Sequence, residues 1–291
     1  MKLLLVGLLM VMGACKPTYK QETLKESVKM LAEKEYNLDV DVKMVGRTLG
    51  VRFKVKNLLT ELYSGDDSIY KKMNGLFTVL ARVALSADVP PRFMVLDIVD
   101  EDNPQFRLVF TRYEEDLRKS MAEALSFTQS QDRLLEEFVV ADRHVPFDPV
   151  ELDLVRLMMM AIDSNTNPEE KASETPFVLE DVKFKDFVAR VSENTMRRML
   201  REKKEVKREG VVREVKATFD AEEGKKGHFK MLIDLAGKPS EVISPMFIEK
   251  TVLPLVAKEV ADLFKSYRFR DFSGITVIEK NSGKILIVPG S

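Results

Sequence analysis

Few residues in this chain are of the types that perform nucleophilic or metal chemistry. The 291 residues include two histidines, one cysteine and no tryptophan. The sequence contains no His-Glu-x-x-His, Gly-x-Ser-x-Gly, Walker or Gly-x-Gly-x-x-Gly motif. The enzyme families that depend on those motifs are therefore excluded, and no cofactor is expected.

One local cluster could supply a general base. Asp142 and His144 flank Arg143, and Asp148 follows shortly after. A carboxylate beside a histidine can orient the imidazole for proton transfer, which makes Asp142 and His144 the candidate catalytic residues. The same residue types are common in loops between helices, where they are solvated or cap a helix end. We favour the loop and expect no catalytic site here.

A second polar run, Asp100-Glu101-Asp102-Asn103, contains the hard oxygen atoms that calcium prefers. The run lacks the spaced oxygens, the central glycine and the distal glutamate of an EF-hand loop. Pro104 follows it. We therefore expect a polar hairpin turn and no metal site.

The first fourteen residues have the layout of a secretory signal peptide. Met1 and Lys2 give a positive start, and Leu3 to Met12 is an uninterrupted run of apolar residues and glycine. Ten residues of helix extend only about 15 Å, whereas the hydrocarbon layer of a bilayer is ~30 Å thick. The run therefore predicts a cleaved signal peptide, residues 1–14, and not a transmembrane helix.

The segment Met12-Gly13-Ala14-Cys15 resembles the lipobox of bacterial lipoproteins. In that class the signal is cut before the cysteine, which is lipidated and becomes the N-terminus. Met12 departs from the usual Leu, Val or Ile. The resemblance implies acyl chains such as palmitate on Cys15, and Lys16 implies the outer membrane, facing the periplasm, in a bacterium with two membranes. An ordinary cleaved signal with an incidental cysteine is the alternative.

A short tether, residues 15–21, connects the expected anchor to the first predicted helix. Its last six residues extend to roughly 20 Å at most. Two or three acyl chains give lasting attachment, whereas one chain alone is marginal. We therefore expect the membrane as a partner, through lipid on Cys15, with the body of the protein close to it.

The hydrophobic pattern predicts an α+β fold. Apolar residues recur three or four positions apart in residues 22–36 and 69–84, as on one face of a helix. Alternating apolar and polar residues predict hairpins in residues 38–55 and 93–113, the first with one buried face and one charged face. The predicted order is helix, hairpin, helix, hairpin.

The same order returns roughly 172 to 179 positions later, which indicates an internal duplication. We predict a first repeat at residues 22–113, a helical connector at 114–181 and a second repeat at 182–291, with antiparallel sheets packed by helices. Coincidence is the alternative, because residue identity between the copies is slight and this order recurs in many α+β proteins.

The connector is predicted to be helical. Apolar spacing indicates helices around Leu117–Leu125, Leu134–Phe138 and Leu152–Ile162, and Asp148-Pro149 is a start signal for the last of them. Residues 158–160 are three consecutive methionines, which suit irregular cores and adaptable binding surfaces. We favour core packing, with a groove for a partner or a lipid as the alternative.

A basic stretch ends the first helix of the second repeat. Its cations could meet the anionic headgroups of a nearby membrane. The candidate membrane-facing residues are Arg197, Arg198, Arg201, Lys203 and Lys204. The solvated end of a helix is the alternative that we favour, because cations also suit the negative end of the helix dipole.

Charge and composition limit the function classes. The 46 basic and 47 acidic residues leave a net charge of -1, so the chain lacks the positive field that nonspecific nucleic-acid binding needs. With an expected anchor and no catalytic motif, the predicted function is a noncatalytic interaction or assembly module of the bacterial cell envelope, with another envelope protein as a candidate partner. The alternatives are a carrier or chaperone for a lipid or other apolar ligand, and an enzyme of unrecognised class.

Overall fold

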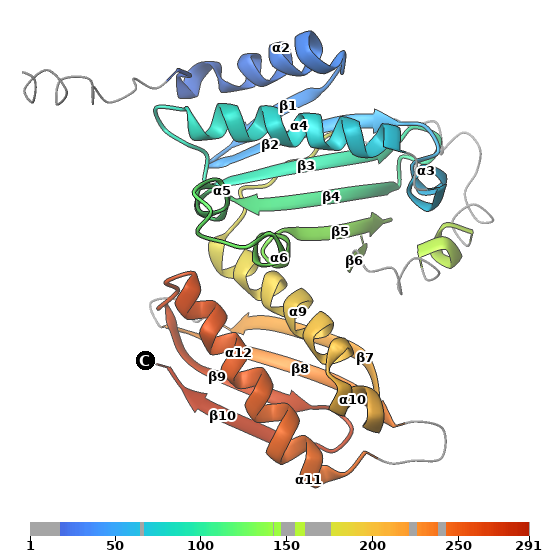
Figure 1. Ribbon diagram of the computed structural model, residues 1–291, viewed down its shortest axis with the longest axis vertical. Coiled ribbons are helices and arrows are strands. Elements are labelled where there is room, and N and C mark those ends of the chain that lie inside the picture. The colour runs from blue at the N-terminus through green and yellow to red at the C-terminus, as the bar shows by residue number, and fades with distance from the viewer. Residues whose placement is uncertain are drawn as a thin grey trace, which may run out of the picture. The chain divides into compact units, whose positions relative to one another are not determined.

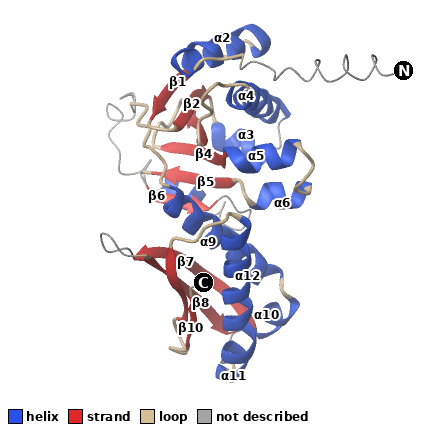
Figure 2. Ribbon diagram, turned by 90° about the vertical axis from the view of Figure 1, so that its left-hand side faces the viewer, coloured by secondary structure: helices blue, strands red, loops and turns tan. Residues whose placement is uncertain are grey.

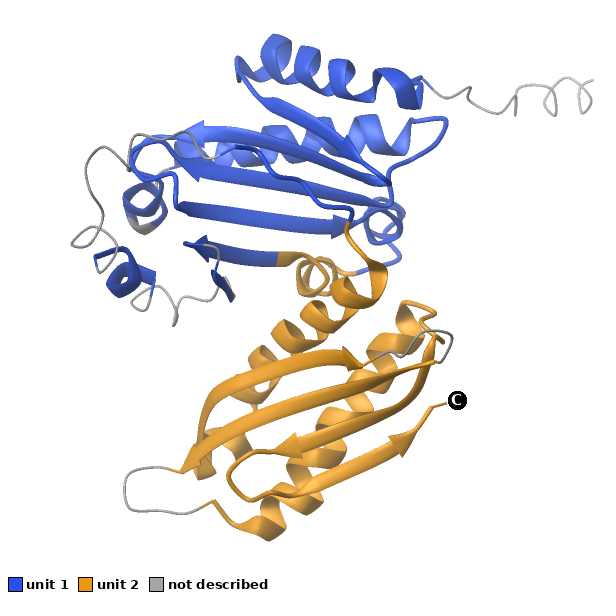
Figure 3. Ribbon diagram, turned by 180° about the vertical axis from the view of Figure 1, so that it is seen from behind, with its two compact units in different colours: residues 1–125, 136–181 blue, residues 126–135, 182–291 orange. Residues whose placement is uncertain are grey.

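The structure is a computed structural model that describes residues 18–64, 67–141, 143–146, 155–160, 176–220, 226–237 and 243–290. It confirms the α+β class, because helices pack on two mixed β-sheets. The chain divides into two compact units, which Figure 3 colours separately. The first comprises residues 1–125 and 136–181, and the second comprises residues 126–135 and 182–291.

The first unit contains a six-stranded sheet in the sequential order β1-β2-β3-β4-β5-β6 (Figure 1). In chain order, the elements that form its first four strands and their helices are η1 (Gln21–Thr23), α2 (Leu24–Tyr36), β1 (Asp41–Val45), β2 (Thr48–Val55), α3 (Leu58–Ser64), α4 (Asp67–Leu85), β3 (Phe93–Asp100) and β4 (Phe106–Tyr113). The strands β1 and β2 pair antiparallel, as do β3 and β4. By contrast, β2 and β3 run parallel.

Helix α4 makes the parallel pairing possible. Parallel neighbours need a long crossover connection, and α4 lies in the connection between β2 and β3. Leu76, Val79 and Leu80 on its inner side are completely or almost completely buried. Phe77 of α4 meets Phe110 of β4 edge to face, with ring centroids 5.3 Å apart. The helix therefore covers one face of the sheet.

The opposite face of β2, predicted to be the charged one, does carry Arg52 and Lys54, but only Lys54 is exposed. Arg52 on that face is only 3% exposed, and its Nη2 lies 2.6 Å from Oδ2 of Asp97 on β3. The Phe177 ring lies over the guanidinium, with 4.7 Å between Arg52 Cζ and the ring centroid. Leu179 and Phe177 also fill the space that a side chain at Gly50 would occupy. A hairpin pattern does not reveal this cover, because the covering residues come much later in the sequence.

The predicted helical connector is partly wrong. The chain continues from β4 as α5 (Glu114–Met121), α6 (Phe127–Asp132), β5 (Leu135–Val140) and β6 (Arg143–Pro146). A strand thus replaces the helix predicted around Leu134–Phe138. A short apolar run fits a strand and a buried helix equally well, and here the sheet decides, since Phe138 stacks on Phe106 of β4 at 5.6 Å. Of the third predicted helix, residues 155–160 are described and are helical.

The second unit contains a four-stranded sheet in the order β10-β9-β8-β7. Besides α6, its elements are α9 (Phe184–Glu202), α10 (Lys204–Glu209), β7 (Gly210–Asp220), β8 (Gly227–Gly237), α11 (Pro245–Phe247), the π-helical turn η3 (Ile248–Val252), α12 (Leu253–Ser266), β9 (Phe272–Glu279) and β10 (Ile285–Pro289). The two hairpins, β7–β8 and β9–β10, are antiparallel, and β8 and β9 run parallel. Helices α9 and α12 contact each other and lie on the same face of the sheet (Figure 1, Figure 2).

An aromatic cluster fixes α12 on this sheet. The Phe264 ring lies 4.9 Å from both Phe229 of β8 and Phe272 of β9, and 5.3 Å from Phe269. Aromatic rings bury large apolar areas and favour such edge-to-face contacts. The core of the second unit therefore lies between its two long helices and one face of the sheet.

Gly75 of α4 allows a close approach to Tyr36 at the end of α2, and a Cβ atom at Gly75 would lie 2.5 Å from Tyr36 Cδ1. We expect Gly75→Ala to lower the free energy of unfolding by about 1 kcal/mol. Overpacking costs about 1–3 kcal/mol, while the gain in helix propensity is only about 1 kcal/mol. Urea unfolding followed by circular dichroism measures the difference.

Asn74→Ala is the matched control, because Asn74 is exposed on the same helix. This substitution gains helix propensity without a new contact and should raise the free energy of unfolding by about 0.5 kcal/mol. If both substitutions stabilise the protein equally, the close packing of α2 on α4 at Gly75 is wrong.

Candidate functional site

Of the residues predicted for lipidation and catalysis, the structure describes only His144. Cys15, Asp142 and Asp148 lie outside the described residues. The sequence favours a loop between two helices for His144. The structure instead places it on strand β6. Its Nδ1 is 3.5 Å from Oε2 of Glu137 on β5, whose side chain is buried while that of His144 is half exposed. A carboxylate from the neighbouring strand therefore faces this imidazole.

The acidic run at residues 100–103 forms the turn of the β3–β4 hairpin. Asp100 Oδ1 accepts hydrogen bonds from the backbone amides of Asp102 and Asn103, at 2.8 and 3.1 Å. Burial raises the pKa of Asp100, although these amides favour its charged form. Throughout the described residues, no group of three or more His, Cys, Asp or Glu side chains is arranged to hold a metal ion.

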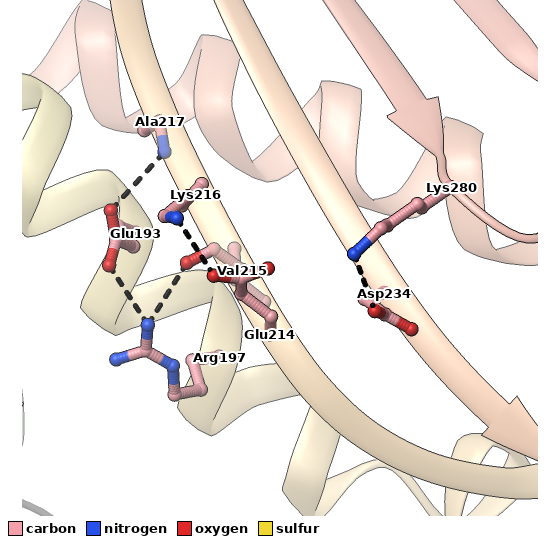
Figure 4. Close-up of polar contacts among 8 residues, drawn as sticks. All are labelled: Glu193, Arg197, Glu214, Val215, Lys216, Ala217, Asp234 and Lys280. Atoms are coloured by element: carbon pink, nitrogen blue, oxygen red, sulfur yellow. Dashed lines mark hydrogen bonds and ion pairs between the residues drawn. The ribbon is translucent and has the colours of Figure 1, made fainter.

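The prediction that Arg197 faces a membrane is wrong, because its side chain is buried. Its Nη2 donates hydrogen bonds to Oε1 of Glu193, at 2.9 Å, and to the carbonyl oxygen of Val215 on β7, at 3.0 Å (Figure 4). Glu193 in turn accepts the backbone amide of Ala217 at 3.2 Å. This pair fastens α9 to β7, and a buried cation of this kind does not reach a membrane.

The other residues of the basic stretch lie nearer the surface. Arg198 forms an ion pair with Asp132 of α6, and Arg201 is half-buried. Lys203 and Lys204 are exposed where α9 ends and α10 begins. Contact between these lysines and a membrane stays a prediction.

The three methionines differ in their surroundings. Met159 is buried, Met158 is half-buried and Met160 is 59% exposed. This arrangement matches a helix that packs one side on a core. A groove for a partner or a lipid at these methionines stays a prediction.

On the face of the second sheet opposite α9 and α12, an apolar patch lies beside polar residues that include Lys216, Lys230 and Thr276. Strand register places Leu232, Ile278 and Ile285 side by side across β8, β9 and β10. They point away from the two helices, because the next residue along β8, Ile233, is fully buried on the helix side. Ile285 and Ile287 are 57% and 67% exposed. Figure 3 shows the sheet from this side, with α12 and most of α9 behind it.

The backbone of β10 has a definite inner and outer side. Lys284 O accepts the amide of Glu279 at 2.9 Å, and the Gly290 amide donates to Ser273 O at 2.8 Å. Both residues therefore direct their backbone groups toward β9. In an antiparallel pair, every second residue does so, and the residues between them direct their N–H and C=O groups the other way.

This alternation determines which groups the edge of the sheet offers. Leu286 and Val288 lie at alternate positions between Lys284 and Gly290, so their backbone N–H and C=O groups point toward β9. Ile285 and Ile287 direct N–H and C=O outward, and Pro289 directs only a C=O outward because proline has no N–H. Since β10 is the last strand in its sheet, this edge offers two donors and three acceptors.

The other edge of the sheet is protected in ways that β10 is not. Strand β7 carries the charged residues Arg213, Glu214 and Lys216, and its register shifts between Val212 and Glu214. Charges, bulges and prolines are usual means by which proteins prevent edge pairing. Strand β10 carries Ile-Leu-Ile-Val before its proline and no charge. It is therefore the edge suited to accept another strand.

Side chains fix the turn that leads into β10. Buried Glu279 accepts the backbone amide of Ser282 at 2.7 Å. Asp234 of β8 accepts a hydrogen bond from the side chain of Asn281, at 2.9 Å. It also accepts one from Lys280, at 3.2 Å (Figure 4). Burial alone would raise the pKa of Asp234, but these hydrogen bonds hold it below its usual value. The turn, and with it the start of β10, is thereby held in place.

The sequence predicts the strand at residues 284–288 but not its role as an open edge. A usable signal is present, because Ile285–Val288 is apolar on both faces of the strand. In a unit with helices on one side of its sheet, such a strand leaves one apolar face without a helix.

No protein-family model matches this chain, and no curated protein or solved structure matches it either. In the part of the chain that the structure describes, no helix combines the length and the apolar character needed to cross a membrane.

The open edge predicts an alternating pattern of amide exchange along β10. We expect the amides of Ile285 and Ile287 to exchange with solvent about tenfold faster, or more, than those of Leu286 and Val288, because only the latter are bonded to β9. Hydrogen exchange followed by NMR on the free protein measures this. Equal protection at all four amides would show that the outer edge is already occupied.

Proposed function

We propose that this chain is a lipid-anchored protein of the bacterial cell envelope, and that its second unit is a noncatalytic interaction module. The module binds an extended segment of another envelope protein, which pairs with β10 as a fifth strand. The observation that carries this proposal is the outer edge of β10, which has no charge or bulge before Pro289, together with the apolar patch beside it.

The proposed anchor rests on the lipobox-like segment that ends at Cys15. With lipid on this cysteine and a tether that ends at residue 21, the body stays within a shallow layer beside its membrane. In a bacterium with two membranes, Lys16 favours the outer membrane and a body that faces the periplasm. The partner segment is then one that reaches this layer.

The magnitudes indicate what the partner segment must supply. Each backbone hydrogen bond contributes about 0.5–1.5 kcal/mol net, so the five outward groups of β10 give only modest affinity. Apolar side chains at alternate positions of the added strand would pack beside Ile285 and Ile287 and bury their exposed surface. Strand addition of this type gains affinity from the backbone and specificity from alternate side chains.

We also infer that the two units arose by duplication, which bears on what occupies this edge. Each unit follows the order helix, hairpin, helix, hairpin, and in each sheet the two hairpins join through a parallel pair. Three of the four corresponding strands begin 179 positions apart: Thr48 and Gly227, Phe93 and Phe272, Phe106 and Ile285. The first pair, Asp41 and Gly210, begins 169 positions apart.

The duplication makes β10 the counterpart of β4. In the first unit, β5 lies along the outer edge of β4. In the second unit, the corresponding edge of β10 has no neighbour among the described strands. A strand from another polypeptide in the position of β5 is therefore the occupant that the chain's own architecture favours. Two copies of the chain would pair less completely in a register centred on Ile287, because Pro289 would then face Ile285 without an N–H.

The edge is tested by photocrosslinking in intact cells, with a photoreactive phenylalanine analogue in place of Ile285. We expect crosslinks to one protein, confined to one short segment of it, and loss of most of this product in the Ile287→Lys variant, because a lysine at the edge disfavours pairing. Mass spectrometry of the crosslinked peptides identifies the segment.

Val211→Lys is the control, since Val211 is 59% exposed on the opposite edge strand, β7. This variant should retain the crosslink. Crosslinks to Ile285–Pro289 of a second copy would replace the proposed partner by self-association. The absence of any crosslinked segment, or equal loss in both variants, would contradict docking at β10.

The anchor is tested separately by Cys15→Ser. We expect this variant to lose incorporation of radiolabelled palmitate and to move from the membrane fraction to the soluble or secreted fraction. Met12→Leu, which restores the usual lipobox residue, should remain labelled and membrane-bound. Labelling that persists in Cys15→Ser would overturn the anchor without affecting the proposal for β10.

A further inference from the structure

An open hollow of about 520 Å³ lies at one end of the second unit, where α9 begins and α12 has just ended. Two triplets line it, Lys183-Phe184-Lys185 and Arg268-Phe269-Arg270, and Asp271 completes the lining. In each triplet a phenylalanine stands between two cations. The two triplets are far apart in the sequence and meet because α9 and α12 pack together.

The aromatic residues form an apolar floor. The rings of Phe184 and Phe269 meet edge to face, with centroids 5.8 Å apart. Phe269 is 8% exposed and is continuous with the core through Phe264. Phe184 also contacts the ring of Tyr267, at 6.1 Å. The floor is therefore held by the core and is not a pair of loose surface rings.

The cations form the rim. All four basic side chains of the two triplets are exposed, whereas the lining contains a single carboxylate, that of Asp271. Like charges gathered at one place cost free energy unless an anion or solvent compensates them. α9 begins at the hollow and α12 ends beside it, so the opposite ends of the two helix dipoles offset each other and the field comes from the four cations. The rim attracts an anion, and the floor accepts an apolar group.

The backbone at Arg268 indicates that this arrangement is not simply the best way to end a helix. The amide of Arg268 donates to Lys265 O and the amide of Phe269 donates to Phe264 O, which is the Schellman pattern of a helix C-terminus. Glycine is usual at the position of Arg268, because the backbone there is left-handed, and Arg268 has φ of 53°. The chain thus keeps a cation at the rim where glycine would fit the turn with less strain.

We propose that this hollow binds an organic anion, with a phosphate or similar charged group held by the rim and an adjoining apolar or aromatic group on the phenylalanine floor. This site is separate from the edge of β10 and does not depend on it. Such a ligand could be a small aromatic phosphate or the headgroup region of an anionic lipid, since both join an anion to an apolar group.

Calorimetric titration of the full chain with phenyl phosphate tests the proposal. We expect its dissociation constant to be at least about tenfold lower than those of inorganic phosphate and of phenol, and to rise with salt concentration. Equal binding of inorganic phosphate would mean that charge alone acts, and equal binding of phenol would mean that the rim has no role. Either result would overturn the proposal.

The variant Arg268→Gly separates binding from folding. We expect phenyl phosphate to bind at least about fivefold more weakly, while the melting temperature stays the same or rises, because glycine suits the left-handed position. Arg208→Gln is the matched control, since Arg208 is exposed in the same unit and the substitution removes one positive charge without touching the hollow. Its binding should change less than twofold. Unchanged binding in Arg268→Gly, or equal weakening in the control, would refute the site.

A soluble phosphatidylglycerol with two six-carbon chains distinguishes the two sources of ligand. If it binds more tightly than phenyl phosphate and loses affinity in Arg268→Gly, the hollow takes an anionic lipid. If phenyl phosphate binds more tightly and shows that loss, the hollow takes a small aromatic anion. If neither probe responds to Arg268→Gly, the hollow is not a binding site.

Discussion

The parallel pairing of the inner strands is the constraint on which both units depend. In each sheet two hairpins meet through a parallel pair, β2 with β3 and β8 with β9. Parallel neighbours require a crossover, and a helix is the usual one. In these units α4 and α12 serve as crossovers, and α2 and α9 pack beside them. These helices lie on one face of each sheet, and the other face needs a cover of different origin.

The two units differ in how they meet this need. In the first, Phe177 and Leu179 lie over the face of β2 and enclose the ion pair of Arg52 with Asp97. In the second, the apolar residues of that face remain at the surface, most of all Ile287. The edges of corresponding strands also differ. Strand β4 has β5 as a neighbour, whereas β10 is at the end of its sheet. Among the described residues, the first unit completes its sheet with its own chain, and the second leaves an edge without a neighbouring strand and Ile285 and Ile287 at the surface.

Local sequence patterns predicted those helices and strands whose buried side is marked by the spacing of their own apolar residues. The stripe of α4, with Leu76 and Leu80 one helical turn apart, is sufficient to define a helix and its inner side. The class of fold and the positions of most strands followed from such periodicity. The strand β5 was mistaken for a helix because its apolar run is too short to show a period, and its pairing with the sheet is a nonlocal fact.

Charged residues were harder to place than apolar ones. A basic run reads as solvated, yet Arg197 is buried because Glu193 precedes it by one helical turn and a carbonyl of β7 completes its hydrogen bonds. The spacing of Glu193 and Arg197 was visible in the sequence, but the carbonyl of Val215 was not. The basic hollow was missed for a related reason, since its two triplets become one surface only after α9 and α12 have packed together.

The fixed turn before β10 determines how much backbone conformational entropy each partner loses when a strand is added, β10 or the incoming segment. Ordering one residue of backbone costs about 1–2 kcal/mol, and Glu279 and Asp234 already hold the chain as it enters β10. This strand therefore loses little freedom when another strand joins it, and nearly all of the ordering falls on the incoming segment. Between two segments with the same side chains, the edge would favour the one that is already extended before the encounter. Rigidity of the partner, as well as its residues, then becomes a basis for selection.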